Sequence, residues 1–342
     1  MAGPAVVIGC TGFVGSHVVA ALLGHGLEVR GCCRHPTRAA EDLAASWNMA
    51  GPGRLQLHQL LLPEDGTEVD PQQMRAAVRG ASAVFLCAGH ESQRPETVNF
   101  MVNAALAVLK AAEAERPGLP VVITSSTGSS NPPGADSAVL KNEAESWSDP
   151  VAQEAAGKFS PAAKTRMELS ALEFVGRDRT GRVVDPARAA AAPRLSIICP
   201  SLILGPRLQP GPLAGNGLPW FARILRGEAM AAAVPDDSMS LISVTDLAKL
   251  HLACLLDPSA AGRYWGVVRS WHWAEILAAA AELLPSFSLP PRNFSRPSPE
   301  TKFDTTRRDA VLTAAFGREF QLKGLREILV ETIEYLKESG NL

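Results

Sequence analysis

The chain has 342 residues, of which 46% are hydrophobic and 20% are charged, and its formal net charge is −2. This composition is typical of a folded protein with one large α/β domain, or with one α/β domain and a smaller lobe. The near-neutral charge gives no support to a nucleic-acid partner or to binding at an anionic membrane surface. No apolar run reaches the roughly 18–20 residues that a membrane span needs.

The first apolar run, Ala5 to Ile8, leads directly into a glycine-rich segment, and no targeting segment is visible before it. We therefore expect a cytoplasmic protein. The cysteines form no CxxC pair and most lie in apolar runs, which predicts buried free thiols in a reducing compartment. Because no histidine lies near them at ligand spacing, we expect no metal site. The six cysteines are Cys10, Cys32, Cys33, Cys87, Cys199 and Cys254.

Short apolar runs alternate with amphipathic stretches in the first part of the chain, which is the pattern of βαβ units and a parallel sheet. Helical patterns lie between the runs, notably at Gly15–Gly24 and Asn99–Glu115, and a further amphipathic helix is expected at Leu325–Lys337. The predicted strands are Ala5–Gly9, Glu28–Cys33, Leu55–Leu60, Ala83–Ala88, Pro120–Ser125 and Leu195–Pro200.

Two long stretches follow no regular period. Gly128–Gly157 is rich in Ser, Pro, Asn and acidic residues, and its length suits a loop over an active site. Gly176–Pro193 has an arginine-rich start and an alanine run, and we expect a surface insertion there.

The first predicted strand is followed by the turn Gly9-Cys10-Thr11-Gly12-Phe13-Val14-Gly15 and then by a helix. This order is what a dinucleotide site requires. The first glycine allows the tight turn, the second lets the backbone approach a pyrophosphate, and the third lets the helix pack on the strand. The helix N-terminus presents free N–H groups and a positive dipole end to the phosphates. The loop therefore predicts a nicotinamide dinucleotide on a Rossmann-type domain.

The second predicted strand is followed by Arg34, with Arg38 one helical turn further on. Sites that prefer NAD usually have Asp or Glu near this place, to hold the ribose 2′-hydroxyl. A guanidinium instead suits a 2′-phosphate, so we expect NADP(H) as the cofactor. The alternative is that these arginines are ordinary solvated surface residues.

We predict a doubly wound parallel α/β sheet with a small, mixed C-terminal lobe. Residues 1–200 are expected to form the NADP-binding Rossmann domain, with an insertion at about 176–193. Residues 201–342 are expected to form mainly a substrate lobe, with 240–257 returning to the Rossmann domain. The ligand cleft is expected between the two.

These motifs, together with later ones, resemble the extended short-chain dehydrogenase/reductases. The nearest subgroup is similar to the dihydroflavonol, anthocyanidin and cinnamoyl-CoA reductases. The resemblance covers nearly the whole chain. Its motifs, in chain order, are Val7 to His17, Val29 to Pro36, Thr124-Ser125-Ser126, Trp147-Ser148-Asp149, Lys164 to Glu168, Cys199 to Pro206, Val244 to Ala248 and Gly262-Arg263-Tyr264.

The resemblance implies the roles of several residues. Ser126 would hydrogen-bond a substrate oxygen, and Lys164 would hold the nicotinamide ribose. Ala88 and Pro200 would line the cofactor site, with Pro200 in the segment that passes the nicotinamide. The ordinary alternatives are a capping serine at the strand end and a surface lysine.

The family pairs its lysine with a tyrosine in a Y-x-x-x-K motif, and this tyrosine protonates the carbonyl oxygen. Four residues before Lys164 this chain has Ser160. Its two tyrosines, Tyr264 and Tyr335, are not expected replacements. A second departure is Leu61, because the family often has an acidic residue near the adenine at this place.

Two side chains are candidates for the missing proton delivery. Ser160 would fix a relay water, and His90, which follows the fourth strand, would titrate near neutrality. A lone histidine in a loop is otherwise polar surface. Aromatic residues of the second lobe form either a substrate pocket or part of the core. They are Trp220, Phe221, Trp271 and Trp273.

The first functional hypothesis is an NADPH-dependent reductase of a small carbonyl compound with altered proton delivery. The second is a catalytically inactive member that binds NADP(H) and acts as a sensor, scaffold or complex subunit. A lyase or isomerase on the same fold is a weaker third. The expected partners are a small-molecule substrate and, by resemblance, a second copy of the chain or a larger complex, with neither nucleic acid nor a membrane span.

Overall fold

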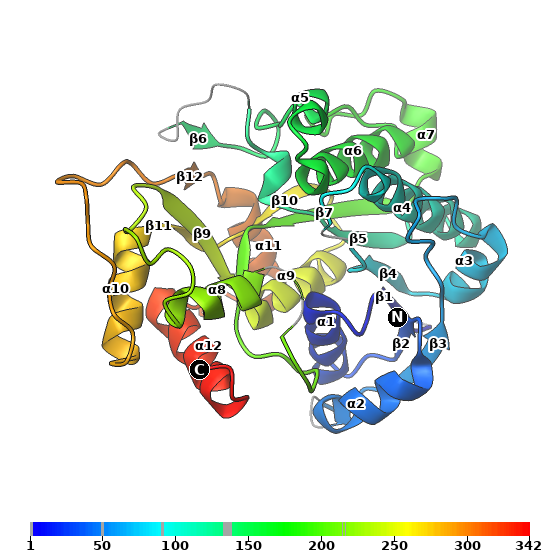
Figure 1. Cartoon of the computed structure of the whole chain (residues 1–342). Helices are drawn as coiled ribbons and strands as arrows, with labels where there is room; N and C mark the ends of the chain where they lie inside the picture. The colour runs from blue at the N-terminus through cyan, green and yellow to red at the C-terminus, as the bar shows by residue number, and fades with distance from the viewer. Residues whose placement is uncertain (1–2, 49–50, 90–91, 133–138, 214, 216) are drawn as a thin grey trace.

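The structure, a computed structural model, describes residues 3–48, 51–89, 92–132, 139–213, 215 and 217–342. A seven-stranded sheet crosses it in the order β10-β7-β5-β4-β1-β2-β3, with every neighbouring pair parallel (Figure 1). Its strands are β1 (Ala5–Ile8), β2 (Val29–Cys33), β3 (Leu55–Gln59), β4 (Ala83–Leu86), β5 (Pro120–Thr124), β7 (Arg194–Pro200) and β10 (Gly262–Gly266).

Helices cover both faces of this sheet, which explains why its central strands are continuous apolar runs. The helices on one face are α3 (Pro71–Val78), α4 (Glu96–Glu115) and α6 (Phe159–Phe174). Those on the other are α1 (Phe13–Gly24), α2 (Pro36–Asn48), α9 (Val244–Leu256) and α11 (Thr306–Phe316). This is the doubly wound α/β fold predicted from the sequence.

The strand order reverses between β1 and β4. The chain builds β1, β2 and β3 in one direction, then crosses to β4, β5, β7 and β10 on the other side. In open parallel sheets, ligands bind beyond the carboxyl ends of the strands at such a reversal. The glycine turn after β1 and the segments after β4 and β5 therefore meet at the same edge.

A smaller mixed sheet has the order β11-β9-β8, with one antiparallel and one parallel pair. The aromatic residues considered for a pocket mostly form the core of this lobe. Phe221, Trp271 and Trp273 are buried, and half-buried Trp220 packs edge-on against Trp273. The elements of the lobe are β8 (Leu202–Leu204), β9 (Ser238–Ser243), β11 (Arg269–His272), α8 (Gly217–Leu225), α10 (Trp273–Leu283) and α12 (Leu325–Glu338).

The six predicted strands are confirmed, with small differences at their ends. The pattern does not predict β10, the short edge strand beside β7. The prediction of one irregular loop at Gly128–Gly157 is wrong in part. That stretch contains most of a 3₁₀ turn, η1 (Thr127–Ser129), the short strand β6 (Leu140–Lys141) and α5 (Pro150–Ala155), and β6 pairs with β12 (Lys302–Phe303).

The stretch at Gly176–Pro193 contains a further helix, α7 (Pro186–Ala191). It is anchored by Arg188, whose guanidinium pairs with Glu113 of α4 and lies 4.0 Å from the ring centroid of Phe174 in α6. Among the described residues, no helix has the combination of length and apolarity that a membrane crossing requires.

A buried histidine joins α9 to the end of β5. His251 Nδ1 lies 2.8 Å from the Leu247 carbonyl oxygen, and Nε2 lies 2.7 Å from the Thr124 hydroxyl. A carbonyl oxygen only accepts, so Nδ1 carries the proton and Nε2 accepts from Thr124. Burial lowers the pKa of His251 from 6.5 to about 4 and keeps the ring neutral.

His251 makes stability depend on pH. Its pKa is lower in the folded chain than in the unfolded chain, so the unfolded chain binds a proton first as the pH falls. The stability that the neutral ring contributes to the folded chain is therefore complete above pH 6.5 and is lost as the pH falls toward 4. The shift corresponds to about 3 kcal/mol of unfolding free energy. We expect His251→Gln to flatten the decline measured by urea denaturation between pH 7 and pH 4.5. His25→Gln, at an exposed position, is the control and should keep the slope. An unchanged slope in His251→Gln would contradict the assignment.

Candidate active site

The predicted glycine turn occupies the short connection between β1 and α1. Gly9 has φ +83°, and a Cβ there would lie 2.5 Å from the backbone nitrogen of Ala88. A Cβ on Gly15 would overlap the Gly9 carbonyl oxygen. Glycine is therefore needed at both positions, and the two bring the start of α1 directly against the end of β1.

The first turn of α1 suits a pyrophosphate. Gly12 is the exposed N-cap residue, and no side chain caps the helix there. The first N–H groups of a helix have no partner within it and lie at the positive end of its dipole. The backbone around Thr11, Phe13 and Val14 thus offers donors where a dinucleotide phosphate would lie, so these residues fit the expected cofactor.

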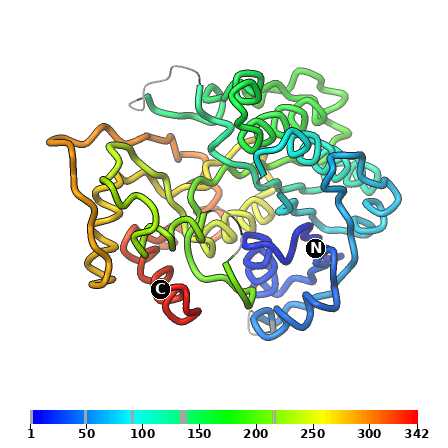
Figure 2. The backbone as a smooth tube through the Cα atoms, viewed as in Figure 1, coloured from blue at the N-terminus to red at the C-terminus, as the bar shows by residue number. Residues whose placement is uncertain are grey.

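A glutamine that follows β8 forms hydrogen bonds with this turn, and the sequence did not predict these bonds. Gln209 Nε2 lies 2.9 Å from the Thr11 carbonyl oxygen, 2.8 Å from that of Gly12 and 2.8 Å from Ser16 Oγ. Figure 2 shows the segment around residue 209, in green, beside the blue α1. Nothing in the local pattern around Gln209 signals these contacts, because its partners lie almost 200 positions away in the chain.

The arginines predicted to read the 2′-phosphate lie where β2 gives way to α2. Arg34 is exposed and its Nη1 lies 2.5 Å from Glu64 Oε1. Arg38, also exposed, pairs with Asp42 at 3.3 Å. An open surface depression here is lined by His35, Pro36, Thr37, Arg38, Glu41 and Gln59. The place predicted for an adenosine phosphate is therefore open to solvent, with the Arg38 side chain in the lining of the depression.

Ser126 follows β5 and is half-buried. Its Oγ accepts a hydrogen bond of 3.1 Å from the Gly128 N–H, so the residue caps η1. A serine hydroxyl has one donor and two acceptor positions, and this bond uses one acceptor. Capping the turn is therefore compatible with donating a hydrogen bond to a substrate oxygen.

Lys164 and Ser160 lie one turn apart on α6 and so share one face of the helix. Lys164 Nζ donates to the Thr124 carbonyl oxygen at 3.1 Å, and a Cβ on Gly89 would lie 3.6 Å from the same Nζ. The ammonium is thus held between the ends of β4 and β5. Ser160 is half-buried, and its backbone N–H donates to Gln93 Oε1 at 3.0 Å.

The other residues that the sequence singled out lie at different places in the structure. Ala88 follows β4, and buried Pro200 ends β7, so both lie at the carboxyl edge of the sheet. His90 lies outside the described residues. Tyr264 is buried, with its oxygen accepting from the Ala261 N–H, and Tyr335 lies in α12 against the core of the second lobe. Neither tyrosine occupies the α6 position that Ser160 holds.

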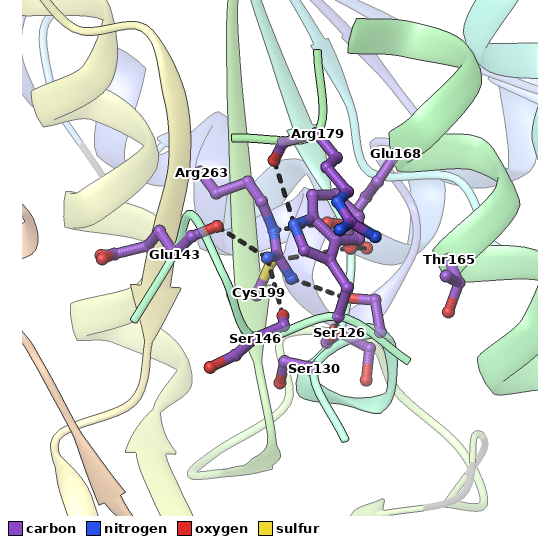
Figure 3. Close-up of polar contacts among 12 residues, drawn as sticks. Ser126, Ser130, Glu143, Ser146, Thr165, Glu168, Arg179, Cys199 and Arg263 are labelled. Carbon is purple, nitrogen blue, oxygen red and sulfur yellow. Dashed lines mark hydrogen bonds and ion pairs between the residues drawn. The ribbon is translucent and has the colours of Figure 1, made fainter. Parts of the chain in front are cut away.

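A buried ion pair joins β10 to α6, the helix that carries Lys164. Arg263 Nε of β10 lies 2.8 Å from Glu168 Oε2 of α6, and both side chains are almost fully buried (Figure 3). The other Glu168 oxygen accepts from the Ser125 hydroxyl. Glu168 follows Lys164 by four residues, so the pair fixes the same helix face that carries the lysine. Both residues belong to family motifs in the sequence, but the sequence predicted no role for either of them.

The same guanidinium holds the loop after β5. Arg263 Nη1 donates to the carbonyl oxygens of Glu143 and Ser146 at 2.9 and 3.0 Å, and Nη2 donates to Ser129 Oγ at 3.1 Å. Its guanidinium carbon also lies 3.8 Å from the ring centroid of Trp147. One side chain thus connects β10, α6 and the loop that follows Ser126.

No group of three His, Cys, Asp or Glu side chains suited to a metal ion occurs among the residues that the structure describes. All six cysteines are free. Five are buried and Cys87 is half-buried.

Comparison with known proteins agrees with this geometry. A family model described as NAD(P)H-binding matches residues 9–157. Cinnamoyl-CoA reductase 1 of Oryza sativa subsp. japonica is 30% identical over 283 residues, which cover 82% of this chain and 76% of that relative. The chain belongs to the extended short-chain dehydrogenase/reductase family.

Two further members of this reductase family extend the likeness. Aldehyde reductase 2 of Sporidiobolus salmonicolor is 27% identical over 320 residues, covering 88% of this chain and 87% of the relative. The solved structure of yeast methylglyoxal/isovaleraldehyde reductase complexed with NADPH has a TM-score of 0.72 at 18% identity. That match covers 99% of this chain and 100% of the yeast chain. The family fold therefore extends over both lobes.

The buried pair predicts a non-additive effect of mutation. Arg263→Met leaves Glu168 charged and without its cationic partner, and should lower the unfolding free energy by about 3–5 kcal/mol. Combining it with Glu168→Gln removes the stranded charge, so the double variant should be more stable than Arg263→Met alone. Urea denaturation of both variants at pH 7 tests this. A double variant less stable than the single one would show that the pair is not the source of the loss.

Proposed function

We propose that the chain is an NADP(H)-dependent oxidoreductase that reduces the carbonyl group of a small molecule, with a proton route that does not use the family tyrosine. The observation that carries this proposal is the position of Lys164. Its ammonium lies at the Thr124 carbonyl oxygen, between the ends of β4 and β5, although the residue four positions earlier is serine. This position supports the proposal that the part of the family site that would hold the cofactor is kept in this chain.

The choice of NADP(H) over NAD(H) rests on Arg34 and Arg38. The ion pair of Arg34 with Glu64 is exposed on both sides, and exposed pairs of this kind contribute little. A doubly charged 2′-phosphate would therefore displace Glu64 from the guanidinium readily. The yeast relative whose structure contains NADPH supports the same cofactor.

NADPH, when bound, supplies a hydride to a carbonyl carbon. The Ser126 hydroxyl donates a hydrogen bond to the substrate oxygen, while Lys164 binds the nicotinamide ribose. The relatives named as aldehyde and cinnamoyl-CoA reductases support a carbonyl compound as substrate.

Delivery of the proton to the carbonyl oxygen is the step that must differ from the family mechanism. A serine oxygen lies one bond beyond Cβ, whereas a phenol oxygen lies across a ring, so Ser160 does not reach the same point. Its pKa is also several units above the roughly 10 of a phenol. Ser160 instead fixes a water that relays the proton, with His90 as the alternative donor. Loss of a placed general acid typically lowers a rate by about 10²–10⁴, so we expect slow turnover.

The second candidate is a catalytically inactive NADP(H)-binding protein that serves as a sensor, scaffold or complex subunit. The specific observation in its favour is the location of both tyrosines, one buried beside Ala261 and the other in the second lobe. By family resemblance, the chain would pair with a second copy through the helix that carries Lys164.

Arg34→Ala separates the two cofactors. Because the substitution removes a partner of the 2′-phosphate alone, we expect NADPH binding to weaken at least tenfold while NADH binding changes little. Fluorescence titration of each cofactor measures this. Arg54→Ala, at another exposed arginine paired with a glutamate, is the control. An equal loss for NADH and NADPH would end the 2′-phosphate argument.

Ser160→Tyr separates the two functions. We expect the native chain to bind NADPH and to oxidise it slowly with a panel of aldehydes and ketones, and the tyrosine variant to be faster. The readouts are NADPH affinity and the rate of absorbance loss at 340 nm. If the native chain binds NADPH without turnover while Ser160→Tyr gains activity, the enzyme function is wrong and the binding function stands. If NADPH does not bind, both are wrong.

A further inference from the structure

Two cysteines, one in the glycine turn after β1 and one at the end of β2, lie close together beside the predicted adenosine site. Cys10 is the second residue of the glycine turn, and Cys33 is the last residue of β2, directly before Arg34. Side chains alternate between the faces of a strand, so Gly31 and Cys33 share one face of β2. A Cβ on Gly31 would lie only 3.0 Å from Cys10 Sγ. The Cys10 side chain thus lies across Gly31, next to Cys33.

The backbone brings the two residues together, because the Cys10 N–H donates to the Cys32 carbonyl oxygen at 3.4 Å, at the peptide that joins Cys32 to Cys33. The Cys32 side chain is not part of this pair. Cys10 and Cys33 pack in the core on the α1 side of the sheet, whereas Cys32 packs in the core on the opposite side. Cys10 is fully buried, and Cys33 keeps 6% of its surface exposed. Cys33 is therefore the sulfur that a small solute reaches first.

The two thiols also differ in their pKa values. The hydrogen bond from the Cys10 thiol lowers the pKa of Cys33 to about 7, helped by a backbone hydrogen bond from His35 and opposed by burial. The same hydrogen bond, together with burial, raises the pKa of Cys10. Near neutral pH, Cys33 thus supplies a thiolate, which is the nucleophilic form, and Cys10 remains a thiol.

We propose that Cys10 and Cys33 form a dithiol that peroxide oxidises and that controls the binding of NADP(H). This proposal rests on the cofactor named under the proposed function. The Cys33 thiolate attacks hydrogen peroxide, so that an S–O bond forms, the O–O bond breaks and hydroxide leaves as water after protonation. Cys10 then attacks the sulfenic sulfur. The S–S bond forms, the S–O bond breaks and a second water leaves. The two thiols lose two electrons, and one peroxide becomes two waters.

Formation of the disulfide would change the backbone conformation of the glycine turn, because the turn is closely packed. An S–S bond is about 2.05 Å long, which is much shorter than the separation of two sulfurs that are only packed together, so Cys10 must move toward β2. Gly9 cannot follow freely because it lies against Ala88 and Gly15. The displacement therefore passes to Thr11 and Gly12, whose backbone faces the pyrophosphate.

The coupling is reciprocal. If the disulfide weakens cofactor binding by some factor, the bound cofactor disfavours the disulfide by the same factor. A tenfold effect corresponds to a rise of about 30 mV in the potential of the dithiol. NADP(H) thus protects the pair from oxidation.

The test uses the full chain treated with hydrogen peroxide, then alkylated and mapped by mass spectrometry without reduction. We expect a Cys10–Cys33 disulfide, at least tenfold weaker NADPH binding after removal of peroxide, and recovery with dithiothreitol. NADP⁺ present during oxidation should slow the loss. Cys33→Ser should bind NADPH equally well before and after peroxide, and Cys10→Ser should form no disulfide.

Cys32→Ser is the matched control, because its thiol lies on the other face of the same strand, and it should respond like the native chain. A disulfide that includes Cys32, oxidation of Cys33 without a disulfide, or a Cys10–Cys33 disulfide with unchanged NADPH affinity would each overturn the inference. These outcomes are read on the native chain and do not depend on any variant folding. Failure of the reduced native chain to bind NADPH would overturn the proposed function as well.

Discussion

The ion pair between Arg263 and Glu168 is the interaction on which the candidate site depends. Charges this deeply buried are stable only when they are paired and hydrogen-bonded, and Arg263 satisfies both requirements by contacting α6 and the loop after β5. The pair therefore fixes the relative position of Lys164 and Ser126 without help from residue 160. In the proposed function Ser160 takes the place of the family tyrosine, and the frame around this position does not depend on that side chain.

In the proposed function, cofactor binding and proton delivery depend on different residues. The glycine turn, the exposed Arg34 and the ammonium of Lys164 would hold the dinucleotide, and none of them needs the phenol of the family tyrosine. Proton delivery is the step that, by the family resemblance, would need that phenol. His251 does not substitute for it, because burial keeps the ring neutral and both ring nitrogens are occupied.

The sequence predicted features that depend on neighbours in the chain. The six strands, the glycine turn and the helices α1 and α4 are encoded by local periodicity and spacing. Features that depend on distant partners were missed. Gln209 contacts the turn across almost 200 residues, and β10 is a strand only because β7 provides its edge. The helix α5 escaped notice because it is short and exposed, and capping by Asp149 rather than an apolar face defines it.

In the proposed function the chain transfers a hydride from NADPH without the family tyrosine. The most direct measurement is the reaction of the native chain with NADPH carrying deuterium in the transferable C4 position, using an aldehyde panel and mass spectrometry of the products. We expect an alcohol with deuterium on the former carbonyl carbon, formed slowly. Absence of any deuterated alcohol from a chain that binds NADPH, under conditions in which Ser160→Tyr produces it, would contradict the claim.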